Sequence, residues 1–378
     1  MEEAGPGPDS GARVERLVVT AYRVPTDAPE SDGTLAWDAT TMVTVELEAG
    51  GETGLGYSYT SAAAVGLIAE TLADDVLGTD PLAVTATWES LARRVRNLGK
   101  PGLCSMAIAA VDTALWDLAA RRLDLPLFRL LGGDGRPVPV YGSGGFTSYD
   151  EDRLRSQLGS WVADGIRRVK MKVGREPDAD PDRVRAARDA VGPGAGLMVD
   201  ANGAYDRKQA LALSTTFADL GVDWFEEPVS SDDLAGLRLL RDRVPAPIEI
   251  AAGEYGFDLF SFRRMLDASA VDVLQADVTR CGGITELRRV AALCRARNVP
   301  LSAHTAPALH LHPCSALTGI RHIEWFHDHV RLERMLLEGA VAPEDGTLRP
   351  VPSRPGHGLR VRREQAERFE TRREERAT

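Results

Sequence analysis

The pattern of apolar and polar residues divides the chain into two unlike parts. Residues 14–24 and 41–50 are rich in β-branched side chains and are typical of strands, and Gly50 with Gly51 predicts a hairpin turn. Helical patterns follow at 62–74, 83–95 and 103–122. The last of these is apolar around much of its circumference, so we expect it to be buried. This first part predicts a small α+β domain.

From residue 136 onward, short apolar strands alternate steadily with helical patterns. Repeated βα units predict a closed barrel with a parallel sheet rather than an open doubly wound sheet. Little clear helix follows the last strand, which predicts a degenerate final unit. The eight predicted strands are 137–142, 168–174, 196–201, 222–228, 247–253, 271–277, 299–304 and 322–326.

These elements predict five regions along the chain. We expect a disordered N-terminus at 1–13, an α+β domain at 14–135 and the barrel at 136–328. Residues 329–361 contain Gly and Pro in loops and are expected to reach back to the first domain. The tail at 362–378 is nearly all charge and predicts a solvated or frayed helix.

Composition narrows the classes of partner. The net charge is −11, which disfavours nucleic acid and anionic membranes, because both require a basic surface. An anionic small substrate remains compatible, because a bound metal reverses the local field. The four cysteines lack zinc-ligand spacing and predict reduced thiols. We find no signal peptide and no apolar run of the roughly 18 residues that span a bilayer, so we expect a cytoplasmic protein.

Strand ends of the predicted barrel carry the candidate chemistry, because barrel enzymes place their active sites there. Arg supplies nearly all of the 45 basic residues, yet residues 168–174 keep Lys170 and Lys172. Strand alternation directs both toward the barrel mouth, on the face opposite the apolar residues. Mutual repulsion and partial burial are expected to lower both pKa values and make one amine a usable base. The alternative is a solvated edge strand with the same alternation.

Three carboxylates end successive predicted strands. Asp200, Glu226 and Glu254 are expected to converge on one point. Together they offer the oxygen ligands that Mg²⁺ prefers and leave positions for water and substrate. The alternative is that each is an ordinary helix cap or loop acid.

One histidine stands apart from the other six. His304 ends the seventh strand, next to the strand that ends in Asp277, and the carboxylate would fix the imidazole tautomer and raise its basicity. We expect His304 to face Lys172 across the mouth, with the metal between them. This set suits removal of a weakly acidic proton beside a carboxylate. The remaining histidines default to structural or surface roles: His310, His312, His322, His327, His329 and His357.

At these residues the sequence resembles the enolase superfamily, mandelate racemase subgroup. The resemblance rests on the Lys-x-Lys of VKMKVG and on DANGAY, WFEEP, AAGE, QADVTRCGG and SAH, in this order. It implies a modified TIM barrel, (β/α)7β, with an N-terminal α+β capping domain completed by C-terminal residues. It also implies one Mg²⁺ held by Asp200, Glu226 and Glu254, and a homo-oligomer.

The resemblance implies a role for each remaining candidate. Lys172 is the base on one face, and His304 with Asp277 is the acid/base on the other. Lys170 neutralises the substrate carboxylate, Glu324 hydrogen-bonds it, and Asn202 lies near the substrate hydroxyl. Trp37 and Tyr57, in cap loops that also hold Asp38 and Tyr59, contact the substrate or simply pack the cap.

The expected reaction is dehydration of an acid sugar, an aldonate or aldarate, to a 2-keto-3-deoxy acid. The alternative is a racemase or epimerase of a 2-hydroxy acid that uses Lys172 and His304 as two bases. The segment HTAPALHLH after His304 differs from the mandelate racemase pattern, which argues against mandelate. Two readings from other classes remain: a Schiff-base aldolase through Lys172, and a metal-binding barrel without turnover.

Overall fold

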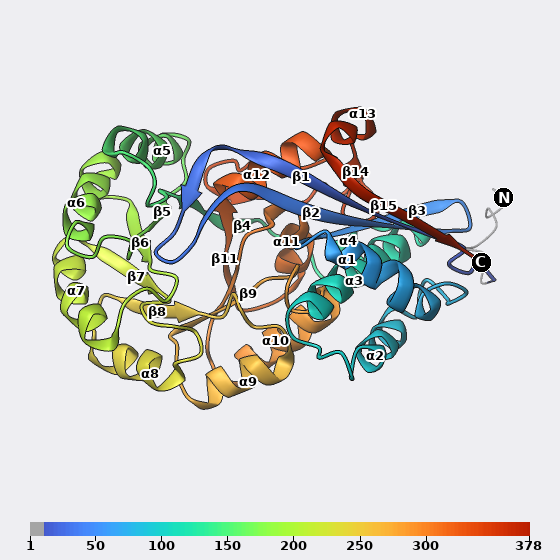
Figure 1. Cartoon of the computed structure of the whole chain (residues 1–378), viewed down its shortest axis with the longest axis horizontal. Coiled ribbons are helices and arrows are strands. Elements are labelled where there is room, and N and C mark those ends of the chain that lie inside the picture. The colour runs from blue at the N-terminus through green and yellow to red at the C-terminus, as the bar shows by residue number, and fades with distance from the viewer. Residues whose placement is uncertain (1–10) are drawn as a thin grey trace.

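An antiparallel sheet of four strands forms the first part of the molecule in the computed structural model, which describes residues 11–378. β1 (Arg16–Ser31), β2 (Ala36–Ala49) and β3 (Glu52–Tyr59) form a meander. Gly50 and Gly51 make the predicted turn, both with the positive φ that glycine adopts without strain. The β1–β2 hairpin extends from this sheet across the barrel (Figure 1). Most of the predicted disordered start, residues 1–10, lies outside the described residues.

Helices cover one face of this sheet and make the cap. They are α1 (Ala63–Gly66), a π-helical stretch Leu67–Leu72 with a 3-10 turn Ala73–Asp75, α2 (Val84–Arg94) and α3 (Leu103–Arg122). α3 packs so closely on β3 that a Cβ at Gly56 would lie 2.2 Å from the Ala110 oxygen. Contrary to expectation, α3 is long and apolar enough to cross a membrane, but 89% of its apolar window is buried in the fold.

The second part is a closed parallel barrel. Its strands are β4 (Val138–Gly144), β5 (Arg168–Lys172), β6 (Gly196–Asp200), β7 (Val222–Glu226), β8 (Glu249–Ala252), β9 (Val273–Ala276), β10 (Leu301–Ala303) and β11 (Ile320–Phe326). Pairing of Glu324 in β11 with Tyr141 in β4 closes the ring. The predicted barrel is therefore confirmed.

Helices surround this barrel on its outside (Figure 1). They are α5 (Glu151–Ala163), α6 (Asp180–Val191), α7 (Arg207–Asp219), α8 (Leu234–Arg243), α9 (Leu259–Asp267), α10 (Ile284–Ala296), α11 (Pro307–Ala316) and α12 (His327–Leu336), with the short α4 (Leu127–Leu130) before β4. α12 follows β11 directly, where the sequence pattern predicted little helix. Its N-terminus lies beside the barrel mouth, which gives it a part in the site.

The chain then returns to both parts of the molecule. β12 (Leu337–Glu338) pairs with β14 (Arg360–Val361), and β13 (Thr347–Leu348) pairs with barrel strand β4. His357 Nε2 lies 2.6 Å from the Leu55 carbonyl oxygen in β3, so this segment contacts the barrel as well as the cap. α13 (Arg363–Ala366) and a 3-10 turn, Glu367–Phe369, lead into β15.

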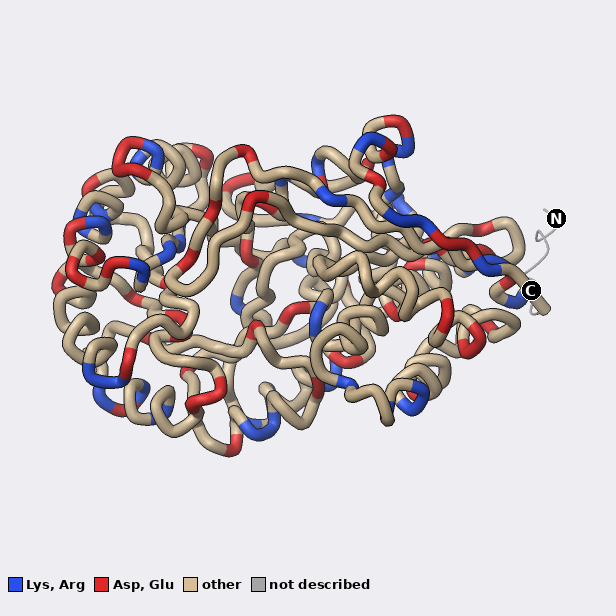
Figure 2. The backbone as a smooth tube through the Cα atoms, in the orientation of Figure 1, with Lys and Arg blue, Asp and Glu red and all other residues tan. Residues whose placement is uncertain are grey.

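The predicted helical tail is wrong from Glu370 onward, because β15 (Glu370–Ala377) is a strand that pairs with β1 along the edge of the cap sheet. Figure 2 shows basic and acidic residues alternating in blocks along it. Arg and Glu favour helices in isolation, but pairing with an otherwise open sheet edge overrides that propensity.

Candidate active site

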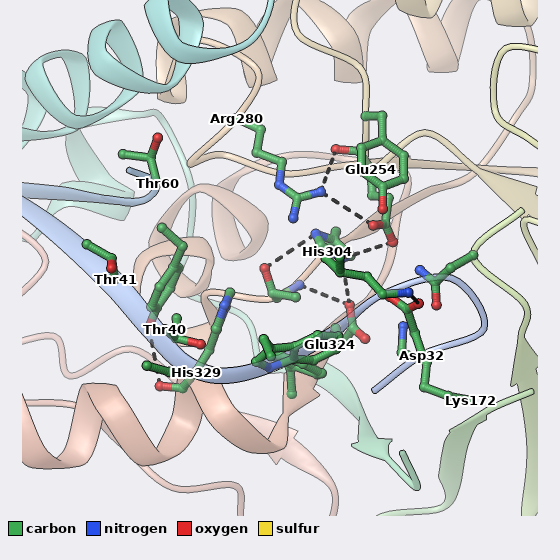
Figure 3. A pocket seen from close by; sticks show the side chains of 18 of the residues that line it. Asp32, Thr40, Thr41, Thr60, Lys172, Glu254, Arg280, His304, Glu324 and His329 are labelled. Atoms are coloured by element: carbon green, nitrogen blue, oxygen red, sulfur yellow. Dashed lines mark hydrogen bonds and ion pairs between the residues drawn. The ribbon is translucent and has the colours of Figure 1, made fainter. Parts of the chain in front are cut away.

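A cavity of about 400 Å³ lies between the barrel mouth and the cap (Figure 3). The barrel contributes Lys172, Asn202, Glu254, Tyr255, Arg280, His304, Thr305, Glu324, Phe326 and His329 to its wall, and the cap contributes Asp32, Leu35, Trp37, Ala39, Thr40, Thr41, Tyr59, Thr60 and Ser61. Five predicted site residues therefore reach it from barrel strands, and Trp37 reaches it from the cap hairpin. Lys170, Asp200, Glu226 and Asp277 are buried behind this wall.

Three carboxylates meet at the base of the cavity. Strand register places Asp200 opposite Glu226, and Glu254 follows β8 by two residues. One oxygen of each lies within 4.8 Å of the others, and none of the three residues is more than 3% exposed. Three buried carboxylates repel each other unless a cation joins them. Their hard oxygen atoms fit a divalent ion such as Mg²⁺.

The two lysines of β5 interact with these carboxylates. Lys170 Nζ lies 2.5 Å from Glu226 Oε1 and 2.9 Å from Glu324 Oε1. Lys172 Nζ lies 2.5 Å from Asp200 Oδ2. Strand alternation placed both correctly inside the barrel.

The expected direction of the lysine pKa shifts is wrong. Burial does lower the pKa of Lys170, but Glu226 and Glu324 more than offset it and raise that pKa well above its usual value. Burial likewise lowers the pKa of Lys172, and Asp200 outweighs both this effect and the repulsion from Lys170. Opposite charges at 2.5–2.9 Å outweigh the repulsion between the two amines.

The predicted histidine–aspartate pair is present. His304 Nδ1 lies 2.9 Å from Asp277 Oδ2, and Asp277 Oδ1 accepts hydrogen bonds from the backbone and hydroxyl of Thr279, both at 2.7 Å. His304 Nε2 lies 3.1 Å from Glu254 Oε2. Burial lowers the pKa of His304, but Glu254, Glu324 and Asp277 raise it to about 10. While no metal ion occupies Glu254, the imidazole is thus held as a cation that can donate a proton.

Arg280 was not found from the sequence. Its Nη1 lies 3.4 Å from Glu254 Oε1 and its Nε 3.5 Å from Asp277 Oδ2. Figure 3 shows the guanidinium above Glu254 and His304 in the cavity. It neutralises the carboxylates that flank His304. Its position three residues after Asp277, in the turn that leaves β9, was the available signal.

His329 was assigned a structural or surface role from the sequence, but it forms part of the cavity wall. Its ring stacks on Tyr59 with centroids 3.4 Å apart, and its Nδ1 accepts a hydrogen bond from the Ala306 backbone. Burial lowers its pKa to about 3, so it is neutral. With Nδ1 accepting, Nε2 carries the proton.

Glu227, the second glutamate of WFEEP, is 1% exposed and has a φ of +38°. Burial, together with Glu254, Asp200 and Glu226, raises its pKa well above the usual value. Sequence reasoning assigned it no role.

Of the two predicted cap residues, one lines the cavity and the other does not. Trp37 lines the cavity and packs edge-on against Phe146 at 5.6 Å between centroids. Tyr57 is fully buried behind the wall and donates to Glu333 Oε1 at 2.6 Å, so its predicted contact with substrate is wrong. Its neighbour Tyr59, two residues along β3 on the same face, reaches the cavity instead.

Comparison with known proteins places the chain among enzymes. The family model described as enolase C-terminal domain-like matches residues 153–366, and the mandelate racemase/muconate lactonizing enzyme N-terminal domain matches residues 16–132. The chain is 35% identical over 355 residues to a 3,6-anhydro-α-L-galactonate cycloisomerase of Streptomyces coelicolor, covering 92% of this chain and 96% of that protein. It is 30% identical over 298 residues to an arabinonate dehydratase of Saccharolobus solfataricus, covering 76% of this chain and 78% of that protein.

Solved structures show the same relationship. A mandelate racemase/muconate lactonizing enzyme-like protein from Rubrobacter xylanophilus matches with a TM-score of 0.93 and 55% identity, covering 95% of this chain and all of that one. A racemase from Streptomyces coelicolor with bound magnesium matches with a TM-score of 0.89 and 33% identity, covering 95% of this chain and 100% of that one. An L-talarate dehydratase from a Polaromonas species, complexed with Mg and L-glucarate, matches with a TM-score of 0.88 and 30% identity. The match covers 97% of this chain and 100% of that one. The chain belongs to the mandelate racemase/muconate lactonizing enzyme family of the Mg-dependent enolase superfamily.

Proposed function

We propose that this protein dehydrates an acid sugar, an aldonate or aldarate, to a 2-keto-3-deoxy acid. One observation carries the proposal: Lys172 and His304, which pairs with Asp277, line one cavity, with three carboxylates between their strands. β6, β7 and β8 separate β5, which holds Lys172, from β9 and β10. Two proton-transfer groups therefore approach a substrate from different sides.

The residues act as follows in this proposal. Asp200, Glu226 and Glu254 hold Mg²⁺, which when bound polarises the substrate carboxylate and stabilises an enediolate. A cation held by Asp200 would offset the carboxylate charge that raises the pKa of Lys172. Lys172, as the free amine, then takes the α-proton onto Nζ. The enediolate electrons then break the bond to the β-hydroxyl, and His304 Nε2 donates its proton to the leaving oxygen. The enol product tautomerises to the 2-keto acid.

Three further residues orient the substrate. Lys170 and Glu324, whose side chains lie 2.9 Å apart next to the three carboxylates, would neutralise and hydrogen-bond the substrate carboxylate. Asn202, in the cavity wall, is placed to contact a hydroxyl. The hydroxyls of Thr40, Thr41, Thr60 and Ser61 suit a polyhydroxylated substrate.

A cycloisomerase is the second candidate, favoured by the cycloisomerase that is 35% identical over 92% of this chain. The same α-proton abstraction would expel a ring ether oxygen in place of a hydroxyl. A racemase or epimerase that uses Lys172 and His304 as two bases remains an alternative. A Schiff-base aldolase is disfavoured, because that chemistry needs no metal ion, whereas three buried carboxylates converge beside Lys172 here.

We also propose a cytoplasmic homo-oligomer that binds neither nucleic acid nor membrane. The net charge of −11 and four buried cysteines with free thiols support this setting.

Proton NMR in D₂O with Mg²⁺ tests the reaction, using aldonates, aldarates, their anhydro and lactone forms, and aryl 2-hydroxy acids. Loss of the α-proton signal with appearance of a 2-keto-3-deoxy product supports dehydration. Opening of a ring without loss of water supports the cycloisomerase. Exchange without either product indicates racemisation. Exchange that persists in Lys172→Ala would overturn the assignment of the base.

A further inference from the structure

Three side chains with metal-binding atoms meet outside the catalytic cavity, where the β1–β2 hairpin crosses the start of α12. Asp27 and Glu30 lie in β1, and His327 is the first residue of α12. One ligand atom of each lies within 4.8 Å of the others. His327 Nε2 and Asp27 Oδ2 are 3.1 Å apart. The cluster joins the cap hairpin to the barrel.

Glu30 is short of a partner in this cluster. The residue is fully buried, and its Oε2 accepts a hydrogen bond from Trp37 Nε1 at 2.8 Å. Its Oε1 is buried with no hydrogen-bond partner among the described residues. Burial, reinforced by Asp328 and Asp27, raises the pKa of Glu30 to about 8. A carboxylate in this position calls for a cation or a proton.

The two nearby arginines pair with carboxylates other than Glu30. Arg153 Nη2 lies 3.2 Å from Asp27 Oδ1, and Arg331 Nη2 lies 2.9 Å from Asp328 Oδ1. Two guanidinium groups thus face three carboxylates, those of Asp27, Glu30 and Asp328. With Glu30 ionised and His327 neutral, as metal ligands must be, one negative charge remains for a cation to balance. Asp27 Oδ2 is not bound to Arg153 and lies 3.1 Å from His327 Nε2.

We propose that Asp27, Glu30 and His327 bind a divalent transition-metal ion, best matched by Zn²⁺, that fastens the hairpin to the barrel. An imidazole and two carboxylates form a ligand set that zinc accepts, with one position left for water. Ligand atoms around tetrahedral zinc lie roughly 3.3 Å apart when the bonds are about 2.0–2.1 Å. The distance between His327 Nε2 and Asp27 Oδ2 already meets this requirement.

Two further features match a metal site. Trp37 holds one oxygen of Glu30, and Arg153 holds one oxygen of Asp27, which are the outer contacts that orient metal ligands. The side chains of Asp27 and His327 are 39% and 23% exposed, so an ion can enter from solvent. The site differs from the three carboxylates of the catalytic cavity, Asp200, Glu226 and Glu254, which offer oxygen ligands alone and suit Mg²⁺.

The metal would act on the catalytic cavity through the hairpin. Trp37, which donates to Glu30, lines that cavity, as do Asp32 and Leu35 at the hairpin turn. An ion at the cluster would therefore hold this wall in place. The inference does not depend on which reaction the cavity performs.

Equilibrium dialysis of the full chain against Zn²⁺ tests the site. Mg²⁺ is present in excess to occupy Asp200, Glu226 and Glu254. We expect one Zn²⁺ per chain in the unmutated protein. We expect Asp27→Asn and His327→Gln to bind at least about tenfold more weakly, since even an outer contact contributes that much. Asp38→Asn is the matched control, because Asp38 lies on the same hairpin but pairs with Arg23. This control should bind as the unmutated chain does.

A measurement without substitutions guards against variants that fail to fold. Co²⁺ added to the Mg²⁺-saturated, unmutated chain should give the visible absorption of a tetrahedral site with nitrogen ligation, and Zn²⁺ should abolish it. Absence of this band, or equal Zn²⁺ binding by His327→Gln, would overturn the proposal. If no Zn²⁺ binds and Glu30→Gln raises the melting temperature, a proton rather than a metal satisfies Glu30.

Discussion

Two histidines line the same cavity but differ in charge, one a cation and the other neutral. His304, on the barrel side, lies among Glu254, Glu324 and Asp277, which raise its pKa to about 10 against the effect of burial. His329, beside the cap, stacks on Tyr59 and packs edge-on against Phe326, and burial lowers its pKa to about 3. The neighbours of a histidine, rather than its burial, decide whether it can deliver a proton. The barrel side of the cavity is therefore suited to chemistry and the cap side to recognition.

Substitution of each histidine by asparagine gives the largest expected contrast. His304→Asn should slow the dehydration by about 10²–10⁴-fold, because the leaving oxygen loses its proton donor. His329→Asn should raise KM and leave kcat nearly unchanged. Steady-state kinetics and α-proton exchange in D₂O measure both. Equal losses of kcat would show that the two sides do not differ in role.

In metal-free buffer, the stability that the two variants lose should depend on pH in opposite directions. The pKa of His304 lies above its unfolded value of about 6.5, so its contribution to stability is complete below that pH and is lost as pH rises toward 10. The pKa of His329 lies below it, so its contribution is complete above about pH 6.5 and is lost as pH falls toward 3.

Urea unfolding from about pH 5 to about pH 10 measures these contributions. The stability deficit of His304→Asn should be greatest at the acidic end, and that of His329→Asn at the alkaline end. Parallel curves would contradict the assigned charges.

A smaller effect, on stability, is expected from the two tyrosines of β3: Tyr57, which lies behind the cavity wall, and Tyr59, which lies in it. Tyr57→Phe removes the hydrogen bond to Oε1 of buried Glu333, which keeps the Ala308 backbone donor on Oε2, and should cost about 1–3 kcal/mol of unfolding free energy. Tyr59→Phe loses a 3.3 Å bond to a backbone oxygen and should cost about 0.5–1.5 kcal/mol. Denaturant titration measures both. A larger loss for Tyr59→Phe would place the more important contact at the cavity wall.

The smallest effect is expected at the surface. Asp74→Ala removes a 3.0 Å pair with Arg376 of β15 in which both side chains are largely exposed, and should cost about 0–1 kcal/mol. The melting temperature measures it, with Arg23→Ala, which removes the exposed pair with Asp38, as control. A loss as large as that of Tyr57→Phe would mean that exposed and buried contacts matter equally here.

The sequence predicted the barrel well because its strands follow the alternation of buried side chains. That rule placed Lys170 and Lys172 inside the barrel, and chain order placed Asp200, Glu226 and Glu254 together. It did not predict the charge on the lysines, because their pKa values depend on carboxylates from other strands. Those distances exist only in the closed barrel.

Elsewhere the sequence prediction failed where tertiary contacts decide the outcome. β15 has the composition of a helix, and only β1 makes it a strand. Tyr57 and Tyr59 share a face of β3, and the packing of α12 buries one and leaves the other in the cavity wall. Arg280 and His329 lie in a turn and a helix whose orientation no local pattern fixes.

The pairing of β15 with β1 joins Arg16 to Ala377. The cap sheet is thus built from strands that precede every barrel strand and from one that follows them all. During synthesis β15 emerges after β4 to β11, so the barrel can form before the cap sheet gains this edge strand. A nascent chain that still lacks residues 370–377 exposes an unpaired sheet edge to its neighbours.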